Sequence, residues 1–427
     1  MSTAEASNSQ RPAIPWSSAS SAPLAVALLY NQNGMASWCW EAAHALQELG
    51  RNVLLIAALD VPLPGTPEVE VVRIDVAGGC ALRRIGIGKT LSAAANLLAA
   101  GPDGLLRRIH ADLAARGVQP AGYILNQSTL VDRSVACPQF VAAWAYPVDL
   151  LAYLRKIPLM VTDKGLKSIM RTVLSSTGWW RRDWRAYRAA DRTLPVTRVL
   201  LQSLRRRSVC CDLVYPGTCV SPVSDRASDG IRLLMAAASL GDSRKRVVWM
   251  LEAMKEMRPP SGVVLQLAGE PDDAVRRAAA GIRLPVEFLG HLKRQELQFV
   301  MQNADIFCFG SILDDWGYVL VEAMANGLAP VAPAISPFDE ILDGVGSCYN
   351  QHSPGDFVRV LCSVISSDLF HERRQARDRA QACFSRQAFG RSILASIESV
   401  TPADAATTSG VKSGVGRLAD EGFDSKY

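Results

Sequence analysis

Apolar runs alternate with amphipathic segments in two separate parts of the chain. In the first part, an apolar strand at 24–34 leads into a helix at 38–50, and a second apolar strand follows at 52–59. The apolar residues of that helix share one face: Trp38, Ala42, Ala45, Leu46 and Leu49. Nearly continuous apolar strands joined by a helix predict a parallel sheet that is covered on both faces.

The pattern is weaker over the rest of the first part. It predicts strands at 70–76, 121–127, 139–146 and 157–163 and a helix at 104–116, while 197–203 and 212–217 close this part. The stretch 91–101 is too short for a membrane span and is expected to be a buried helix.

A polar link at 221–230 separates this part from a second, clearer alternation. Strands are predicted at 231–239, 262–270, 286–291, 304–311 and 328–335, and helices at 247–257 and 318–326. Two such runs predict an α/β protein with two Rossmann-like domains facing each other across a cleft. We expect an N-terminal domain at 23–215 and a C-terminal domain at 216–385, with polar, disordered ends at 1–22 and 401–427.

The composition indicates the cellular compartment of the protein but not its function. The 427 residues carry a net charge of +5 and ten scattered cysteines, with no C-x-x-C pair. Scattered thiols are typical of a reduced, cytoplasmic protein. The polar N-terminus lacks the apolar core of a signal peptide, and no run of about 20 apolar residues predicts a membrane span. A nucleic-acid partner is not expected.

The stretch DDWGYVLVEAMANG at 314–327 carries the strongest candidate site. Gly317 allows a tight turn into a helix whose first N–H groups have no helical partner, so they can bind a phosphate. Glu322, just over one turn in, can accept hydrogen bonds from a ribose diol, and Asp314 can reach sugar hydroxyls. The alternative is that Glu322 is a solvated helix residue and that the acids merely cap the helix.

Three other segments lie where ligands bind in open α/β sheets, at the carboxyl ends of predicted strands. Arg244 and Lys245 in SLGDSRKR could neutralise a diphosphate, although an exposed basic turn explains them equally well. Gly290 and His291 end the strand at 286–291, where backbone amides could contact a nucleobase or phosphate. Gly34 follows the first strand and opens the first helix.

Together, these segments resemble the second domain of the retaining glycosyltransferases of family four, which have the GT-B fold. The family pattern is an acid, seven residues and then Glu, with an aromatic–glycine pair between them and EAMA at the end. Asp314 and Glu322 match the acids, and Trp316–Gly317 match the pair. The similarity extends over about 197–345, is weaker in 24–60 and is faint in 61–195.

The resemblance implies a role for each matching residue. Lys245, with Arg244 as a second basic residue beside it, would neutralise the leaving diphosphate, Glu322 would hold the ribose and Asp314 the transferred sugar. Amides of Gly317, Tyr318 and Val319 would contact phosphate or sugar. As in family members, a final segment at 386–400 would cross back to the N-terminal domain.

Three departures from the family pattern stand out. Asp314 replaces the usual Glu, Ser239 stands near the position of the usual Arg of the first loop, and the histidine expected in the first domain is missing. The chain also lacks a D-x-D motif. We therefore expect no metal and no cofactor, with positive side chains and a helix N-terminus stabilising the leaving diphosphate.

Other motifs favour plainer interpretations. RRIGIGKT at 83–90 lacks the first glycine of a P-loop and is interpreted as a chance match, and the five histidines show no metal-binding spacing. The segment 176–195, rich in Trp and Arg, allows two interpretations. In the first, its aromatic and basic side chains contact an anionic membrane surface. In the second, Trp179, Trp180 and Trp184 are buried in the protein.

The sequence thus predicts a glycosyltransferase that moves a sugar from a UDP- or GDP-linked donor to a saccharide or lipid-linked acceptor in cell-surface polysaccharide or glycolipid synthesis. We expect a cytoplasmic protein, peripheral at the membrane if the segment 176–195 binds lipid. Two alternatives stay open: a degenerate protein that binds nucleotide sugars without turnover, and a sugar-nucleotide epimerase of similar fold.

Overall fold

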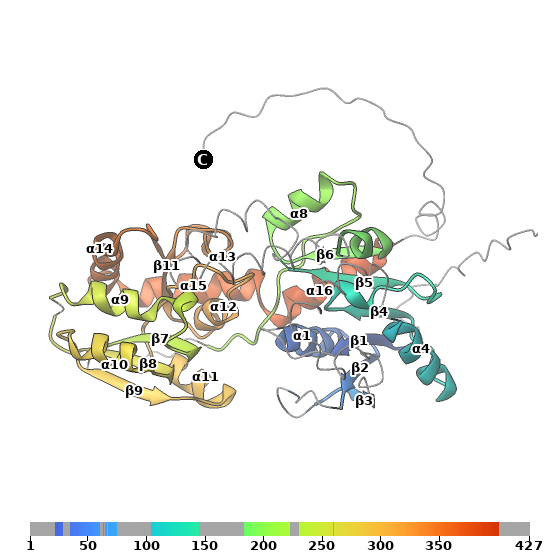
Figure 1. The fold of residues 1–427 in the computed structure, drawn as a ribbon, viewed down its shortest axis with the longest axis horizontal. Helices are drawn as coiled ribbons and strands as arrows, with labels where there is room; N and C mark the ends of the chain where they lie inside the picture. Colours follow the sequence, from blue (N-terminus) through green and yellow to red (C-terminus); the bar gives the residue numbers. More distant parts are fainter. Residues whose placement is uncertain are drawn as a thin grey trace, which may run out of the picture.

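The computed structural model describes residues 22–28, 35–59, 67–74, 104–144, 183–222, 230–258 and 260–400, together with Leu63 and Gly65. Two α/β domains lie side by side, each built around a parallel sheet (Figure 1). Gly34, the stretch 91–101, the P-loop-like segment 83–90 and the strand predicted at 157–163 lie outside the described residues.

The N-terminal domain has six parallel strands in the order β3-β2-β1-β4-β5-β6. The strands are β1 (Leu24–Leu28), β2 (Val53–Ala58), β3 (Glu70–Ile74), β4 (Gly122–Leu125), β5 (Gln139–Ala143) and β6 (Arg192–Pro195). Its helices include α1 (Met35–Glu48), α4 (Leu105–Ala115) and α8 (Arg198–Arg205). Strands β1 and β2 are buried along their whole length, as their continuous apolar sequences predict.

The C-terminal domain repeats this plan, with the order β12-β11-β10-β7-β8-β9. The strands are β7 (Ile231–Ser239), β8 (Val263–Glu270), β9 (Val286–Gly290), β10 (Ile306–Cys308), β11 (Ala329–Pro333) and β12 (Ser347–Tyr349). The helices are α9 (Val247–Met254), α10 (Asp273–Ala280), α11 (Arg294–Gln302), α12 (Tyr318–Ala325), α13 (Phe338–Leu342), α14 (Pro354–Ile365), α15 (Leu369–Cys383) and α16 (Arg386–Glu398).

Each sheet has one point at which the strand order reverses. It lies between β1 and β4 in the first domain and between β7 and β10 in the second. The crevice outside the carboxyl ends of two such strands is where open α/β sheets bind ligands. The fold therefore directs attention to the loops that follow β7 and β10.

The end of the first domain contains elements that the sequence pattern did not define. The last strand, β6, lies inside the segment rich in Trp and Arg, and residues 198–205 form a helix. Thr197 caps this helix by accepting a hydrogen bond from the Leu200 N–H, and Leu200 and Leu204 are buried four residues apart. That spacing is helical, but so short a segment is easily mistaken for an apolar run.

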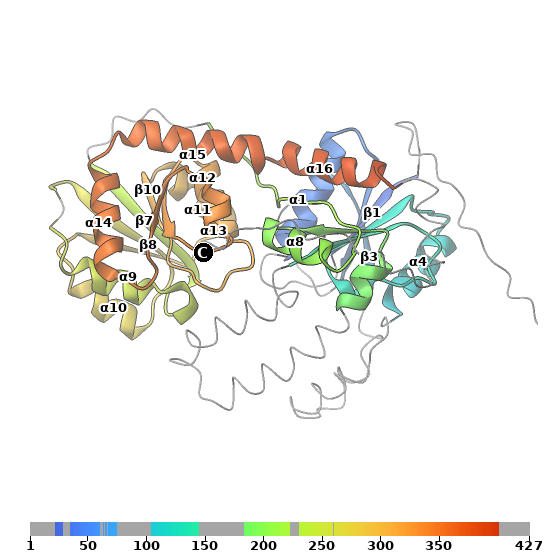
Figure 2. The ribbon, with the colours of Figure 1, turned by 90° about the horizontal axis from the view of Figure 1, so that it is seen from above.

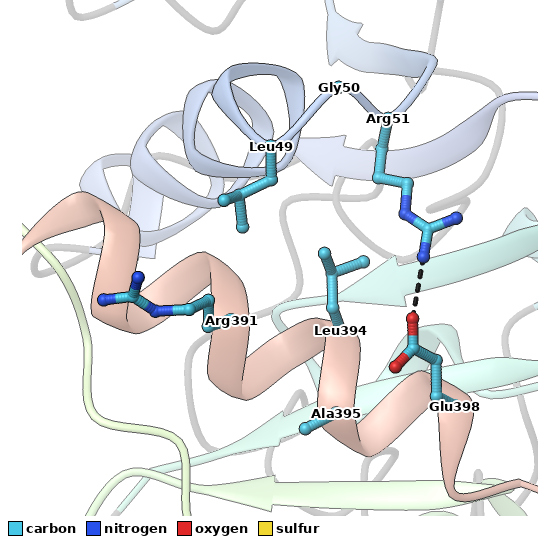
Figure 3. A pocket seen from close by; sticks show the side chains of 7 residues that line it. All are labelled: Leu49, Gly50, Arg51, Arg391, Leu394, Ala395 and Glu398. Carbon is cyan, nitrogen blue, oxygen red and sulfur yellow. Dashed lines mark hydrogen bonds and ion pairs between the residues drawn. The ribbon is translucent and has the colours of Figure 1, made fainter. Parts of the chain in front are cut away.

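Helices α15 and α16 run along both domains (Figure 2). Helix α16 packs on α1 of the N-terminal domain, and the chain passes between the domains at two adjacent points, where Thr218 and Ser385 form a β-bridge. Near the far end of this packing, α1 and α16 border a cavity of about 350 Å³, at which Arg51 pairs with Glu398 at 2.7 Å (Figure 3).

The close approach of α16 to α1 depends on a glycine. A Cβ at Gly390 would lie 2.8 Å from Leu49 Cδ1 and 2.9 Å from the Ala45 carbonyl oxygen. We expect Gly390→Val to force the helices apart and to lower the free energy of unfolding by about 1–3 kcal/mol. Thermal denaturation should show a lower Tm for this variant, whereas Gly355→Val, which meets nothing within 4 Å, should stay close to wild type. Equal Tm values for both variants would contradict this packing.

Candidate active site

Two loops meet at the carboxyl edge of the second sheet. The short helix η3 (Ser243–Lys245) follows β7, and the loop leading to Asp314 follows β10, the neighbouring strand. The Ile312 N–H donates to the Arg244 carbonyl oxygen at 3.2 Å. A Cβ at Gly310 would lie 2.7 Å from the Lys245 carbonyl oxygen, so glycine lets the loops approach this closely.

The approach of the loops brings Lys245 and Asp314 together. Lys245 Nζ lies 2.7 Å from both carboxylate oxygens of Asp314. Their side chains are 25% and 19% exposed, so the pair is accessible but partly desolvated. A diphosphate entering here would meet an ammonium group that is already positioned, and it would share or replace the carboxylate as its partner.

Arg244 stands beside this pair but is held by another residue. Its guanidinium donates to both carboxylate oxygens of Asp242, with Nη2 at 2.6 Å from Oδ2. This hydrogen bond raises the pKa of Arg244 and lowers that of Asp242, and the charges of Asp314 and Asp315 raise the pKa of Arg244 further. Arg244 is thus a tethered cation that adds positive charge beside Lys245.

Helix α12 begins directly after the Asp314 loop. Its cap, Gly317, has a φ of 90°, and a Cβ there would lie 3.0 Å from Phe338 Cε1, so both backbone and space require glycine. Tyr318 and Val319 are the first two helical residues, and their N–H groups therefore have no partner within the helix. The turn is anchored by Trp316, a buried side chain that stacks on Tyr215 at 5.4 Å. The result is a helix N-terminus suited to an anion.

Glu322 lies further along α12 and is half-buried. Burial raises its pKa to about 7; the charge of Arg294 on α11 opposes the increase, and that of Glu41 on α1 adds to it. Charges on a helix of its own domain and on a helix of the other domain therefore both act on this carboxyl group. It is not the solvated helix residue of the alternative interpretation.

The structure brings some predicted site residues together and leaves others apart. Lys245, Asp314 and Gly317 lie around one point at the β7/β10 edge, with Arg244 adjacent. Gly290 and His291 follow β9, which is separated from β7 by β8, and His291 is exposed.

Several residues at the domain boundary were not predicted from the sequence. Glu41 accepts hydrogen bonds from Arg294 and Arg386, and the Trp144 ring lies 6.4 Å from the Tyr318 ring. A usable signal existed for Glu41, which is a single acid within the apolar helix segment WCWEAAHAL, as Glu322 is within its own helix.

The described part of the segment 176–195 is packed rather than open. Residues 183–189 form a helix in which Trp184 is buried, and Arg207 lies over its ring at 4.3 Å. Trp179 and Trp180 are outside the described residues. Among the helices that the structure describes, none combines the length and apolar character needed to cross a bilayer.

Comparison with known proteins finds a family model that matches the part of the chain carrying this edge of the sheet. Residues 231–367, which include Lys245, Asp314 and Glu322, match the sequence model of the glycosyl transferases group 1. The C-terminal domain is therefore similar to the glycosyl transferases group 1 over these residues. The group 1 domain accounts for the second sheet through α14, while the first sheet lies outside the match.

Relatives of the group 1 domain agree with this assignment. The D-inositol 3-phosphate glycosyltransferase of Mycolicibacterium vanbaalenii is 28% identical over 204 residues, which cover 41% of this chain and 44% of that protein. A phosphatidyl-myo-inositol mannosyltransferase of Mycobacterium tuberculosis is 30% identical over 148 residues, which cover 33% and 39% of the two chains. The chain thus matches less than half the length of these curated relatives.

The fold extends beyond the group 1 domain. Sucrose-phosphate synthase from Thermosynechococcus elongatus superimposes with a TM-score of 0.60 at 16% identity, covering 87% of this chain and 97% of that one. Together with the two six-stranded sheets, this likeness confirms the GT-B fold predicted from the sequence.

Proposed function

We propose that the protein transfers a sugar from a nucleoside diphosphate sugar to an acceptor hydroxyl. The observation that carries this proposal is the Lys245–Asp314 pair, held at the β7/β10 edge beside the N-terminus of α12. A cation and unpaired amides suit a diphosphate, and carboxylates suit sugar hydroxyls. The match to the group 1 family supports the same chemistry.

In this proposal each group acts on a different part of the donor. The bond between the anomeric carbon and the phosphate oxygen breaks, and the acceptor oxygen bonds to that carbon as its proton passes to the leaving diphosphate. Lys245 and the amides of Tyr318 and Val319 stabilise the charge that develops on the leaving diphosphate. Asp314 accepts hydrogen bonds from the sugar, and Glu322 accepts them from the ribose. Retention of the anomeric configuration belongs to the proposal through the family resemblance alone.

The acceptor is proposed to be a saccharide or a lipid-linked group, used in cell-surface polysaccharide or glycolipid synthesis on the cytoplasmic side. The names of the relatives, an inositol 3-phosphate glycosyltransferase and a phosphatidyl-inositol mannosyltransferase, support such acceptors. Peripheral membrane contact through 176–195 stays part of the proposal, although Trp184 within this segment is buried and so does not contribute to such a contact.

The test is a panel of UDP- and GDP-sugars incubated with candidate acceptors, with release of the nucleoside diphosphate as readout. Release that requires both donor and acceptor supports transfer. Binding in a thermal-shift assay without release supports the degenerate binding protein, since a ligand that binds only the native state raises the Tm. Conversion of the donor sugar without any acceptor supports the epimerase.

We further propose that transfer needs no divalent cation, because Lys245 and the helix N-terminus supply the positive charge that a metal would otherwise provide. Adding excess EDTA to the transfer assay should change the rate by less than about twofold, which corresponds to a barrier change of about 0.4 kcal/mol. Loss of activity in EDTA that is restored by Mg²⁺ or Mn²⁺ would contradict this proposal.

A further inference from the structure

A buried carboxylate of the N-terminal domain binds two arginines from beyond that domain's sheet. Glu41 on α1 is 1% exposed. It accepts a hydrogen bond from Arg294 Nη2 at 2.6 Å and another from Arg386 Nε at 2.8 Å. Arg294 begins α11 of the C-terminal domain, and Arg386 begins α16 directly after the second chain crossing. A carboxylate this deeply buried requires such partners, so the contact specifies how the domains meet.

Arg294 influences two carboxyl groups at once. It is hydrogen-bonded to Glu41, and its charge also acts on Glu322, the group proposed to hold the ribose. Glu41 and Arg294 have opposite effects on the pKa of Glu322, since the former raises it and the latter lowers it. The ion pair across the domain boundary is therefore electrostatically connected to the donor site.

Few other titratable groups surround this cluster within the described residues. Tyr318 on α12 and Cys39 on α1 lie near Glu322 and Glu41, and burial raises the pKa of both Tyr318 and Cys39, so both are neutral near pH 7. Cys219 lies beside Glu41 and its two arginines, and burial raises its pKa too. Among the described residues, the charged groups that act on Glu322 are thus Arg294 and Glu41.

We propose that Glu41 is a positioning residue of the donor site, which holds Arg294 across the domain boundary and so couples contact between the domains to donor binding at Glu322. The inference rests on the proposed function, because it assigns the ribose contact to Glu322. While Glu41 holds Arg294, that guanidinium is only a partial partner for Glu322, whose carboxylate is left to accept ribose hydroxyls. When the domains separate, Arg294 is released to Glu322 and competes with the ribose.

The coupling is testable through the pH dependence of nucleotide binding. Affinity for UDP and for GDP is measured by calorimetry between about pH 5.5 and 8.5, because a carboxylate accepts ribose hydrogen bonds better than the neutral acid does. For the wild-type protein, affinity should rise with pH, with a midpoint near the Glu322 pKa of about 7. Titration of the ligand itself is the same for every variant and cancels in the comparison.

Two substitutions should move this midpoint in opposite directions. Glu41→Gln removes a negative charge and frees Arg294, so the midpoint should fall by about one pH unit. Arg294→Met removes the positive charge, so the midpoint should rise by a similar amount. Glu41→Asp, which restores the charge, should return it toward wild type. Glu48→Gln is the matched control, because Glu48 also lies on α1 and pairs with Arg386 at 2.7 Å but is 42% exposed.

The outcomes separate this inference from the proposed function. A wild-type protein that binds neither UDP nor GDP overturns both. A wild-type protein that binds with a midpoint near 7, but whose midpoint Glu41→Gln and Arg294→Met leave unchanged or move in the same direction, overturns only the coupling. If circular dichroism shows that Glu41→Gln is unfolded, Arg294→Met still decides, since the Arg294 side chain is 39% exposed and tolerates replacement better. A wild-type affinity without any midpoint in this range also overturns the coupling.

Discussion

Replacing Lys245 with alanine should lower the rate of sugar transfer about 100-fold or more, the largest effect expected from any single substitution described above. The Lys245 ammonium group lies 2.7 Å from both carboxylate oxygens of Asp314. Without it, the leaving diphosphate loses a preorganised charge, and removing one such group typically costs about 2.7–4 kcal/mol of transition-state stabilisation. The tethered Arg244 should not compensate, because Asp242 holds its guanidinium.

The measurement is kcat/KM for nucleoside diphosphate release, with the best donor and acceptor from the panel. Lys255→Ala is the matched control, since Lys255 also pairs with an acid, Glu252, but at the exposed end of α9. It should retain nearly full activity. Lys245→Arg should recover part of the lost rate, because it restores the charge with a different geometry. Wild-type activity in a folded Lys245→Ala protein would remove the central group from the proposed site.

Replacing Glu322 with alanine should lower transfer at least tenfold, or about 1.4 kcal/mol of transition-state stabilisation. The carboxylate is the proposed acceptor for the ribose diol, and alanine would leave the ribose hydroxyls without that hydrogen-bond partner. The variant should also lose affinity for the free nucleoside diphosphate, because it lacks the contact with the ribose. Lys245→Ala should lower the same affinity by removing the contact with the phosphates.

Glu256→Ala provides the control for this second prediction. Glu256 is exposed just beyond α9, so removing its carboxylate changes the net charge equally without touching the β7/β10 edge. The control should leave transfer nearly unchanged. If Glu322→Ala is folded and as active as Glu256→Ala, the ribose is not held at this position.

The second domain could be predicted from sequence far better than the first. Its strands β7, β10 and β11 are largely apolar, and Gly317 and Gly327 mark both ends of α12. By contrast, β6 has only four residues, two of which are Arg192 and Pro195, so neither its length nor its composition signals a strand. It forms because β5 offers a partner, which is a property of the sheet and not of the segment.

For the candidate site too, the sequence predicts the residues better than it predicts the contacts between residues that lie far apart in the chain. The loops carrying Lys245 and Asp314 could be found from their places after strands, but their pairing joins residues 69 positions apart and depends on β7 lying next to β10. Arg244 donates hydrogen bonds to the Asp242 carboxylate, and the spacing of the two residues in the sequence does not predict this contact. The contact between Glu41 and Arg294 requires knowing how the two domains face each other.

The return of α16 to the first domain has a consequence for how the protein is made. Arg386 is separated from its partner Glu41 by 345 positions, and Phe389 packs against Trp38 with ring centroids 5.6 Å apart. As the chain leaves the ribosome, the first domain emerges without the helix that covers α1, and the whole second domain must follow before that helix appears. Until α16 is made, Trp38 lacks its contact with Phe389 and Glu41 lacks Arg386, so a nascent chain halted before α16 would expose part of the apolar surface of α1 to chaperones.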